Sequence, residues 1–65
     1  KIELNGKNKT VKSDSCLHEL INELKIPIKK IAIELNREIV DKKKIKKIKL
    51  KNNDVIEIVH FIGGG

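Results

Sequence analysis

The stretch that decides the fold is the C-terminal segment Val55-Ile56-Glu57-Ile58-Val59-His60-Phe61-Ile62-Gly63-Gly64-Gly65. Residues 55–62 form the most strand-like run in the sequence, because β-branched and aromatic residues dominate it. Ile56 and Ile58 fall on one face, while Val55, Val59 and Phe61 fall on the other. Apolar residues on both faces predict a central strand whose C-terminal half emerges from the sheet. Three glycines follow it.

A hairpin and a helix are predicted upstream. Asn5-Gly6 favours a two-residue turn in which both residues have positive φ, so residues 1–4 and about 9–12 are expected to pair as strands, with Val11 in the core. Leucine and isoleucine then recur with helical spacing, and Pro27 prevents continuation beyond about residue 26. The apolar positions of this helix are Leu17, Leu20, Ile21 and Leu24.

A second hairpin is predicted after the helix. Ile31, Ile33 and Leu35 alternate with other residues, and a turn at 36–38 leads into Ile39-Val40. The lysine-rich segment Lys42–Lys51 is expected to be a loop, with a helical turn and a short extended piece near residues 48–50. The fold class is therefore α+β, with a mixed sheet of four to five strands packed on one helix. Residues 1–62 form the predicted domain and residues 63–65 a flexible tail.

The composition limits the classes of function. A chain of 65 residues has little room for a deep catalytic pocket, so an enzyme acting alone is not expected. The net charge of +6 suits a polyanionic partner, but only one aromatic residue is present for stacking on bases, so we do not expect nucleic-acid binding. The lysine run is interpreted as a solvated face that also steers the chain to an acidic partner. No apolar run spans a membrane, and we expect a cytoplasmic protein.

The glycine tail carries a carboxylate that can be chemically activated. Glycines lack a Cβ, and three of them reach about 10 Å when extended, enough to enter the active site of another protein. The carboxylate of Gly65 is a poor electrophile until ATP converts it to an acyl-adenylate, which a nucleophile then captures. Alone, such a run is equally typical of a frayed terminus.

Several segments together resemble the ubiquitin-like β-grasp sulfur carriers, and most closely the ThiS family of thiamine biosynthesis. The similarity covers nearly the whole chain, and its final block is the most specific part. The segments are Leu4-Asn5-Gly6, Leu17-His18-Glu19-Leu20, residues 32–40 and residues 53–65. Asn53 stands where the family commonly has Gly. Cys16 replaces a Thr-like helix cap, so capping is assigned to Ser15 or Asp14.

The resemblance implies a protein cosubstrate. An E1-like activating enzyme would adenylate Gly65 using ATP and magnesium, neither of which this chain binds as a cofactor. A cysteine desulfurase would supply the sulfur of a thiocarboxylate, and a thiazole synthase would receive it. Gly64 would be the second obligatory small residue, and Gly63 belongs to the same tail. A molybdopterin-type sulfur carrier, a ubiquitin-like modifier and, in a different class, a small basic nucleic-acid-binding domain remain alternatives.

Three residues near the tail are candidates for partner binding. Val59, Phe61 and Ile62 map to the exposed half of the last strand, where large apolar side chains are unusual on a small protein. We expect them to dock on the activating enzyme and the synthase. The alternative is that Phe61 covers the core.

The other candidate sites have structural interpretations. Cys16 is interpreted as a cap or packing residue, although a helix N-terminus can activate a thiol. His18 and His60 lack further ligands at a suitable spacing, so no metal site is expected and both are predicted to face solvent.

Overall fold

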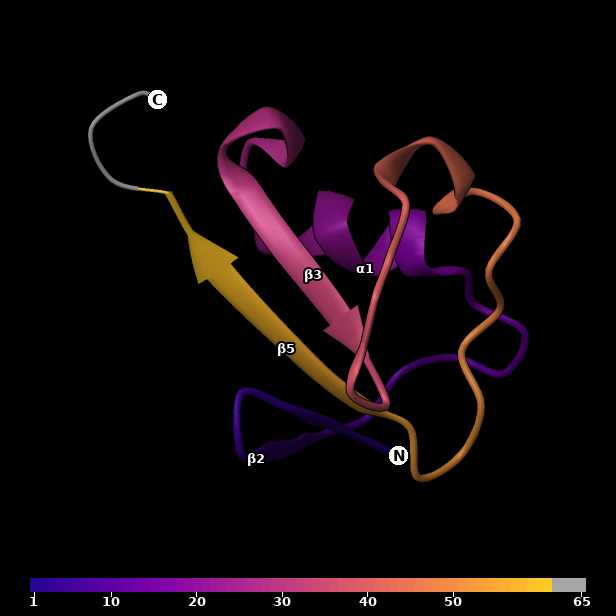
Figure 1. Ribbon diagram of the computed structural model, residues 1–65. Coiled ribbons are helices and arrows are strands. Elements are labelled where there is room, and N and C mark those ends of the chain that lie inside the picture. The colour runs from indigo at the N-terminus through magenta and orange to yellow at the C-terminus, as the bar shows by residue number, and fades with distance from the viewer. Residues whose placement is uncertain (62–65) are drawn as a thin grey trace.

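The computed structural model describes residues 1–61, so the predictions for Ile62, Gly63, Gly64 and Gly65 lie outside the described residues. These residues form one five-stranded sheet and one α-helix (Figure 1). The elements are β1 (Ile2–Leu4), β2 (Lys7–Lys9), α1 (Leu17–Leu24), β3 (Ile31–Leu35), β4 (Glu38–Ile39) and β5 (Val55–His60), with 3₁₀ turns η1 (Ile28–Lys30) and η2 (Lys42–Lys44).

The last strand is central, as its sequence predicts. The sheet order is β2-β1-β5-β3-β4, so β5 lies between β1, which is parallel to it, and β3, which is antiparallel. The prediction of a strand over residues 55–62 is too long at its end, because β5 ends at His60 and Phe61 lies outside it. β3 provides paired residues only from Ile31 onward, and Ile31 pairs with His60. Phe61 still donates its N–H to the carbonyl of Lys30 at 2.8 Å. The end of β5 is therefore held beside the start of β3.

The first hairpin has the predicted turn but a different second strand. Asn5 and Gly6 both have positive φ, at 48° and 81°. Because the turn has only two residues, Lys7 lies opposite Leu4, and β2 occupies residues 7–9 rather than 9–12. Val11 follows the strand and still packs partly buried against the core.

The helix begins and ends near the predicted residues. Its cap confirms the interpretation of Cys16 as a capping residue, whereas the assignment of the cap to Ser15 or Asp14 is wrong. Cys16, rather than Ser15 or Asp14, is the N-cap, and its N–H donates to the Glu19 carboxylate at 3.1 Å. Ser15 instead donates its hydroxyl to the carbonyl of Lys12 at 2.6 Å. The hydrogen bond from the Cys16 backbone is the main cause that lowers the pKa of Glu19 below its ordinary value.

The second hairpin and the lysine-rich segment agree with the sequence in outline. Asn36 and Arg37 form the turn with φ of 51° and 72°, which starts β4 at Glu38 rather than Ile39. The lysine-rich segment contains the 3₁₀ turn η2 and a short extended piece in which Lys49 bridges to Cys16. Its apolar residues Ile45 and Leu50 are buried, so they attach this segment to the core.

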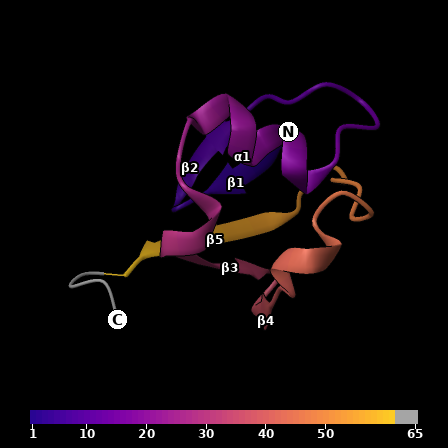
Figure 2. The ribbon, with the colours of Figure 1, turned by 90° about the horizontal axis from the view of Figure 1, so that it is seen from above.

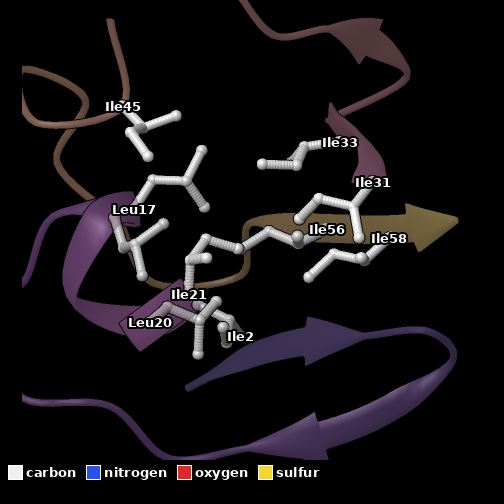
Figure 3. Close-up of a cluster of buried hydrophobic side chains, with 10 residues drawn as sticks. Ile2, Leu17, Leu20, Ile21, Ile31, Ile33, Ile45, Ile56 and Ile58 are labelled. Atoms are coloured by element: carbon white, nitrogen blue, oxygen red, sulfur yellow. The ribbon is translucent and has the colours of Figure 1, made fainter. Parts of the chain in front are cut away.

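The core lies between one face of the sheet and α1 (Figures 2 and 3). Alternate residues of each strand point toward the helix, and a fully buried Leu or Ile side chain stabilises the fold by about 1.5–3 kcal/mol. The buried residues are Ile2, Leu17, Leu20, Ile21, Ile31, Ile33, Ile45, Leu50, Ile56 and Ile58. The opposite face of the sheet is not covered by the helix. Within residues 1–61, no helix has the length and apolar character needed to cross a membrane.

Candidate docking face and tail root

Two of the three apolar residues predicted to bind partners are exposed at the end of β5. Val59 is 58% exposed and Phe61 is 53% exposed, whereas Ile56 and Ile58 on the other face of the strand are buried. Phe61 is therefore not part of the core that the structure describes. Ile62, the third predicted docking residue, lies outside the described residues. Val59 and Phe61 thus form an apolar surface directly before the tail, which we call the tail root.

Lys42 holds the tail root from a distant part of the sequence. Its ammonium group donates to the carbonyl of Ile28 at 3.0 Å and to the carbonyl of Ile31 at 2.8 Å. The same nitrogen lies 5.7 Å from the centroid of the Phe61 ring, within the range of a cation–π interaction. One side chain therefore connects η2, the entry to β3 and the residue after β5.

Asn5 holds the other edge of β5. Its side-chain oxygen accepts from the N–H of Ile58 at 2.7 Å, and its side-chain nitrogen donates to the Ile58 carbonyl at 3.2 Å. Its backbone N–H donates to the Ile56 carbonyl at 2.9 Å. The Asn5 side chain thus pairs with β5 beyond the last backbone pair between β1 and β5, at a point where the backbone of Asn5 has already entered the hairpin turn.

The beginning of β5 is fixed by a buried carboxylate. Asp54 is only 8% exposed and accepts from the N–H of Lys51 at 2.7 Å and from the side chain of Asn36 at 3.0 Å. Asn36 in turn accepts from the N–H of Val55 at 2.8 Å. Asn53, which precedes this carboxylate, adopts a φ of 73°, which Asn tolerates better than most residues.

The remaining candidate residues do not gather into a site. Cys16 is a free thiol, half-buried at the N-cap of α1. His18 is half-buried rather than fully solvated, whereas His60 is exposed. Within residues 1–61 there is no group of three or more His, Cys, Asp or Glu side chains arranged to hold a metal ion.

The sequence did not identify the residues that hold β5 in place. In the sequence Lys42 is one lysine in a basic run, and Asn5 is identifiable only as a turn residue. Their functions depend on contacts with residues 11 to 53 positions away in the sequence, and local patterns contain no signal for such contacts.

A five-stranded mixed sheet on one helix, with its central last strand leading to a glycine tail, defines a ubiquitin-like β-grasp protein. Comparisons with known proteins specify the class further. The ThiS family model matches residues 2–65. The chain is 38% identical to the sulfur carrier protein ThiS of Bacillus subtilis, and the match covers 98% of each sequence.

Solved structures and longer relatives agree with this match. The fold is similar to the crystal structure of the thiamine biosynthesis protein ThiS from Geobacter metallireducens, with a TM-score of 0.84, 30% identity, and coverage of 98% of this chain and 97% of that one. A thiazole synthase of Paramagnetospirillum magneticum is 35% identical over the whole of this chain, which spans 20% of that protein. The chain belongs to the ThiS family, the small sulfur carrier proteins of thiamine biosynthesis.

Proposed function

We propose that this chain carries sulfur as a thiocarboxylate on Gly65 and delivers it for thiazole formation. The observation that carries the proposal is the family match over residues 2–65, which includes all three glycines of the tail. The exposed tail root supports it, because a carrier needs a surface by which other proteins recognise it close to the group that it delivers.

The chemistry begins with activation of Gly65. In an E1-like enzyme supplied with ATP and magnesium, the terminal carboxylate attacks the α-phosphorus of ATP and expels pyrophosphate. The terminal sulfur of a persulfide, provided by a cysteine desulfurase, then attacks the carbonyl carbon and AMP leaves. A thiol reduces the resulting acyl disulfide and frees the thiocarboxylate. In this scheme the chain is a cosubstrate, not an enzyme, and it binds no cofactor of its own.

The tail root is the proposed contact with both partners. Val59 and Phe61 present apolar area next to the segment that must enter a catalytic site, and Ile62 extends this surface in sequence. A thiazole synthase is the proposed acceptor, since two thiazole synthases contain a region similar to this chain. We place these reactions in the cytoplasm, where ATP and reducing thiols are both available.

The proposal is tested by ATP–pyrophosphate exchange with the purified E1-like activating enzyme. The wild-type chain is expected to stimulate exchange. A chain extended by one alanine beyond Gly65 is expected not to, because the added residue displaces the reactive carboxylate. Equal stimulation by the extended chain, or no stimulation by the wild type, contradicts the proposal.

A further inference from the structure

Two distant segments bind the corner at which η1 leads into β3. From η2, the ammonium group of Lys42 donates to the carbonyls of Ile28 and Ile31, at 3.0 Å and 2.8 Å. Carbonyls at the end of a helical turn lack the partners that another turn would supply, and a cation can satisfy them. From the end of β5, the N–H of Phe61 donates to the carbonyl of Lys30 at 2.8 Å. The lysine and the last described residue are thus attached to the same corner.

The backbone that carries Lys42 is itself fixed. Asp41 is the N-cap of η2, and its carboxylate accepts from the N–H of Lys43 at 2.9 Å. On the other side of the turn, Ile45 is buried in the core. Both ends of the Lys42 side chain are therefore held, whereas the side chain of Lys43 on the same turn is exposed.

Phe61 depends on this corner because strand pairing stops before it. β5 pairs with β3 as far as His60, and the Phe61 side chain is 53% exposed. The Lys42 nitrogen lies 5.7 Å from the centroid of the Phe61 ring, within the range of a cation–π interaction. The hydrogen bond to Lys30 thus fixes the backbone of Phe61, and Lys42 fixes its ring.

The position of Phe61 matters for the residues that follow it. Residues 63–65 are all glycine, and a glycine segment imposes little direction of its own, because few backbone conformations are closed to it. Reaction rates in an active site depend steeply on geometry, and a misplacement of about 1 Å can cost roughly a hundredfold. Accurate delivery of the Gly65 carboxylate therefore requires that the chain be held where it leaves the sheet.

We propose that Lys42 is a positioning residue for activation of the tail. This inference rests on the proposed function. Lys42 acts through Phe61 and touches no reacting atom: it sets the direction in which the chain leaves β5. Without its ammonium group, the apolar area of Val59 and Phe61 can still dock, but a smaller share of the docked chains brings Gly65 to the reacting position. The loss then falls on the maximal rate and not on the half-saturating concentration.

The test measures ATP–pyrophosphate exchange with the activating enzyme against chain concentration, at a temperature at which every variant is folded. Lys42→Met is expected to lower the maximal exchange rate roughly fivefold or more. Its half-saturating concentration is expected to stay within about twofold of wild type, as are both parameters of Lys43→Met, which removes the same charge from an exposed position on the same turn.

Two further variants separate positioning from loss of stability. Lys42→Arg is expected to restore most of the rate, because a guanidinium group keeps the charge, can donate to two carbonyls and stacks on aromatic rings. Ile21→Val removes a methyl group from the core on the helix side of the sheet, and is expected to lower the melting temperature while the exchange rate is kept.

Hydrogen exchange of the free chain supplies a readout that needs no enzyme. The Phe61 amide, which donates to the carbonyl of Lys30, is expected to exchange roughly tenfold faster in Lys42→Met than in wild type. The Ile58 amide, which Asn5 holds from the other edge of β5, is expected to change less. Equal acceleration at both amides would show a general loss of stability and overturn the positioning role.

The exchange assay can overturn the inference in three further ways. An unchanged maximal rate in Lys42→Met overturns it, and so does a higher half-saturating concentration at an unchanged maximal rate, which would assign Lys42 to docking. A loss in Ile21→Val as large as in Lys42→Met, or no recovery in Lys42→Arg, also overturns it. These failures leave the proposed function standing, whereas absence of exchange with the wild-type chain overturns the proposed function and this inference together.

Discussion

The Lys42 ammonium group lies 5.7 Å from the centroid of the Phe61 ring while it donates to two carbonyl oxygens at the entry to β3. These contacts join a 3₁₀ turn to the last described residue before the tail. The tail root is therefore positioned by a side chain and not by strand pairing alone, since β5 ends at His60.

Replacing Lys42 is expected to destabilise this end of the sheet. Lys42→Met removes two charge-assisted hydrogen bonds and the cation–π contact, and we expect the free energy of unfolding to fall by about 1–3 kcal/mol. Lys43→Met is the matched control, since the Lys43 side chain is exposed on the same turn. Urea unfolding measures both. Equal stability of the two variants contradicts a specific role for Lys42.

Asn5 is expected to stabilise β5 through its side chain. Asn5→Gly keeps the positive φ but loses both hydrogen bonds to Ile58, and we expect a loss of about 1–3 kcal/mol in unfolding free energy. Faster hydrogen exchange at the Ile58 amide is the local readout. Arg37→Gly is the control, because Arg37 also has positive φ and its side chain is exposed. If both glycine variants behave alike, the effect comes from the backbone and not from the side-chain hydrogen bonds.

Phe61 is expected to act in docking rather than in folding. Because its side chain is 53% exposed, Phe61→Asp should change the unfolding free energy by no more than about 1 kcal/mol. Adenylation should slow by roughly tenfold or more, as expected for an apolar interface anchor. Thr10→Asp adds the same charge at an exposed position in the chain and controls for electrostatics. Loss of folding in Phe61→Asp would show that the ring supports the core.

The Glu19 cap gives the fold a dependence on pH. Its pKa is lowered mainly by the hydrogen bond from the Cys16 backbone, so the carboxylate stabilises the folded state above its unfolded-state pKa. That stabilisation is lost as the pH falls through the lower, folded-state pKa. The difference in melting temperature between wild type and Glu19→Ala should therefore be greatest near neutral pH and shrink in acid. A difference that does not vary with pH rules out the ionised cap.

The sequence predicted the features that depend on local patterns. Two-residue periodicity identified β3 and β5, and the spacing of Leu17, Leu20 and Ile21 identified the helix with its buried face. Asn5-Gly6 identified the first turn. Because this turn has only two residues, β2 begins earlier in the sequence than predicted. Capping preferences favour Ser15 or Asp14 over Cys16, and they do not predict that Cys16 is the N-cap in the folded chain.

The residues that position the site could not be found in this way. The roles of Lys42 and Asn5 depend on which strands become neighbours in the folded sheet. Such features follow from the fold, whereas the sequence alone shows only exposed polar residues.

The most direct test of the account is the intact mass of the chain after incubation with the activating enzyme, ATP, magnesium, a persulfide sulfur source and a thiol reductant. We predict a mass increase equal to the replacement of one oxygen by one sulfur, located in the C-terminal peptide that contains Gly65. An unchanged mass, or sulfur located on Cys16 in place of Gly65, would contradict a carrier that works through its terminal carboxylate.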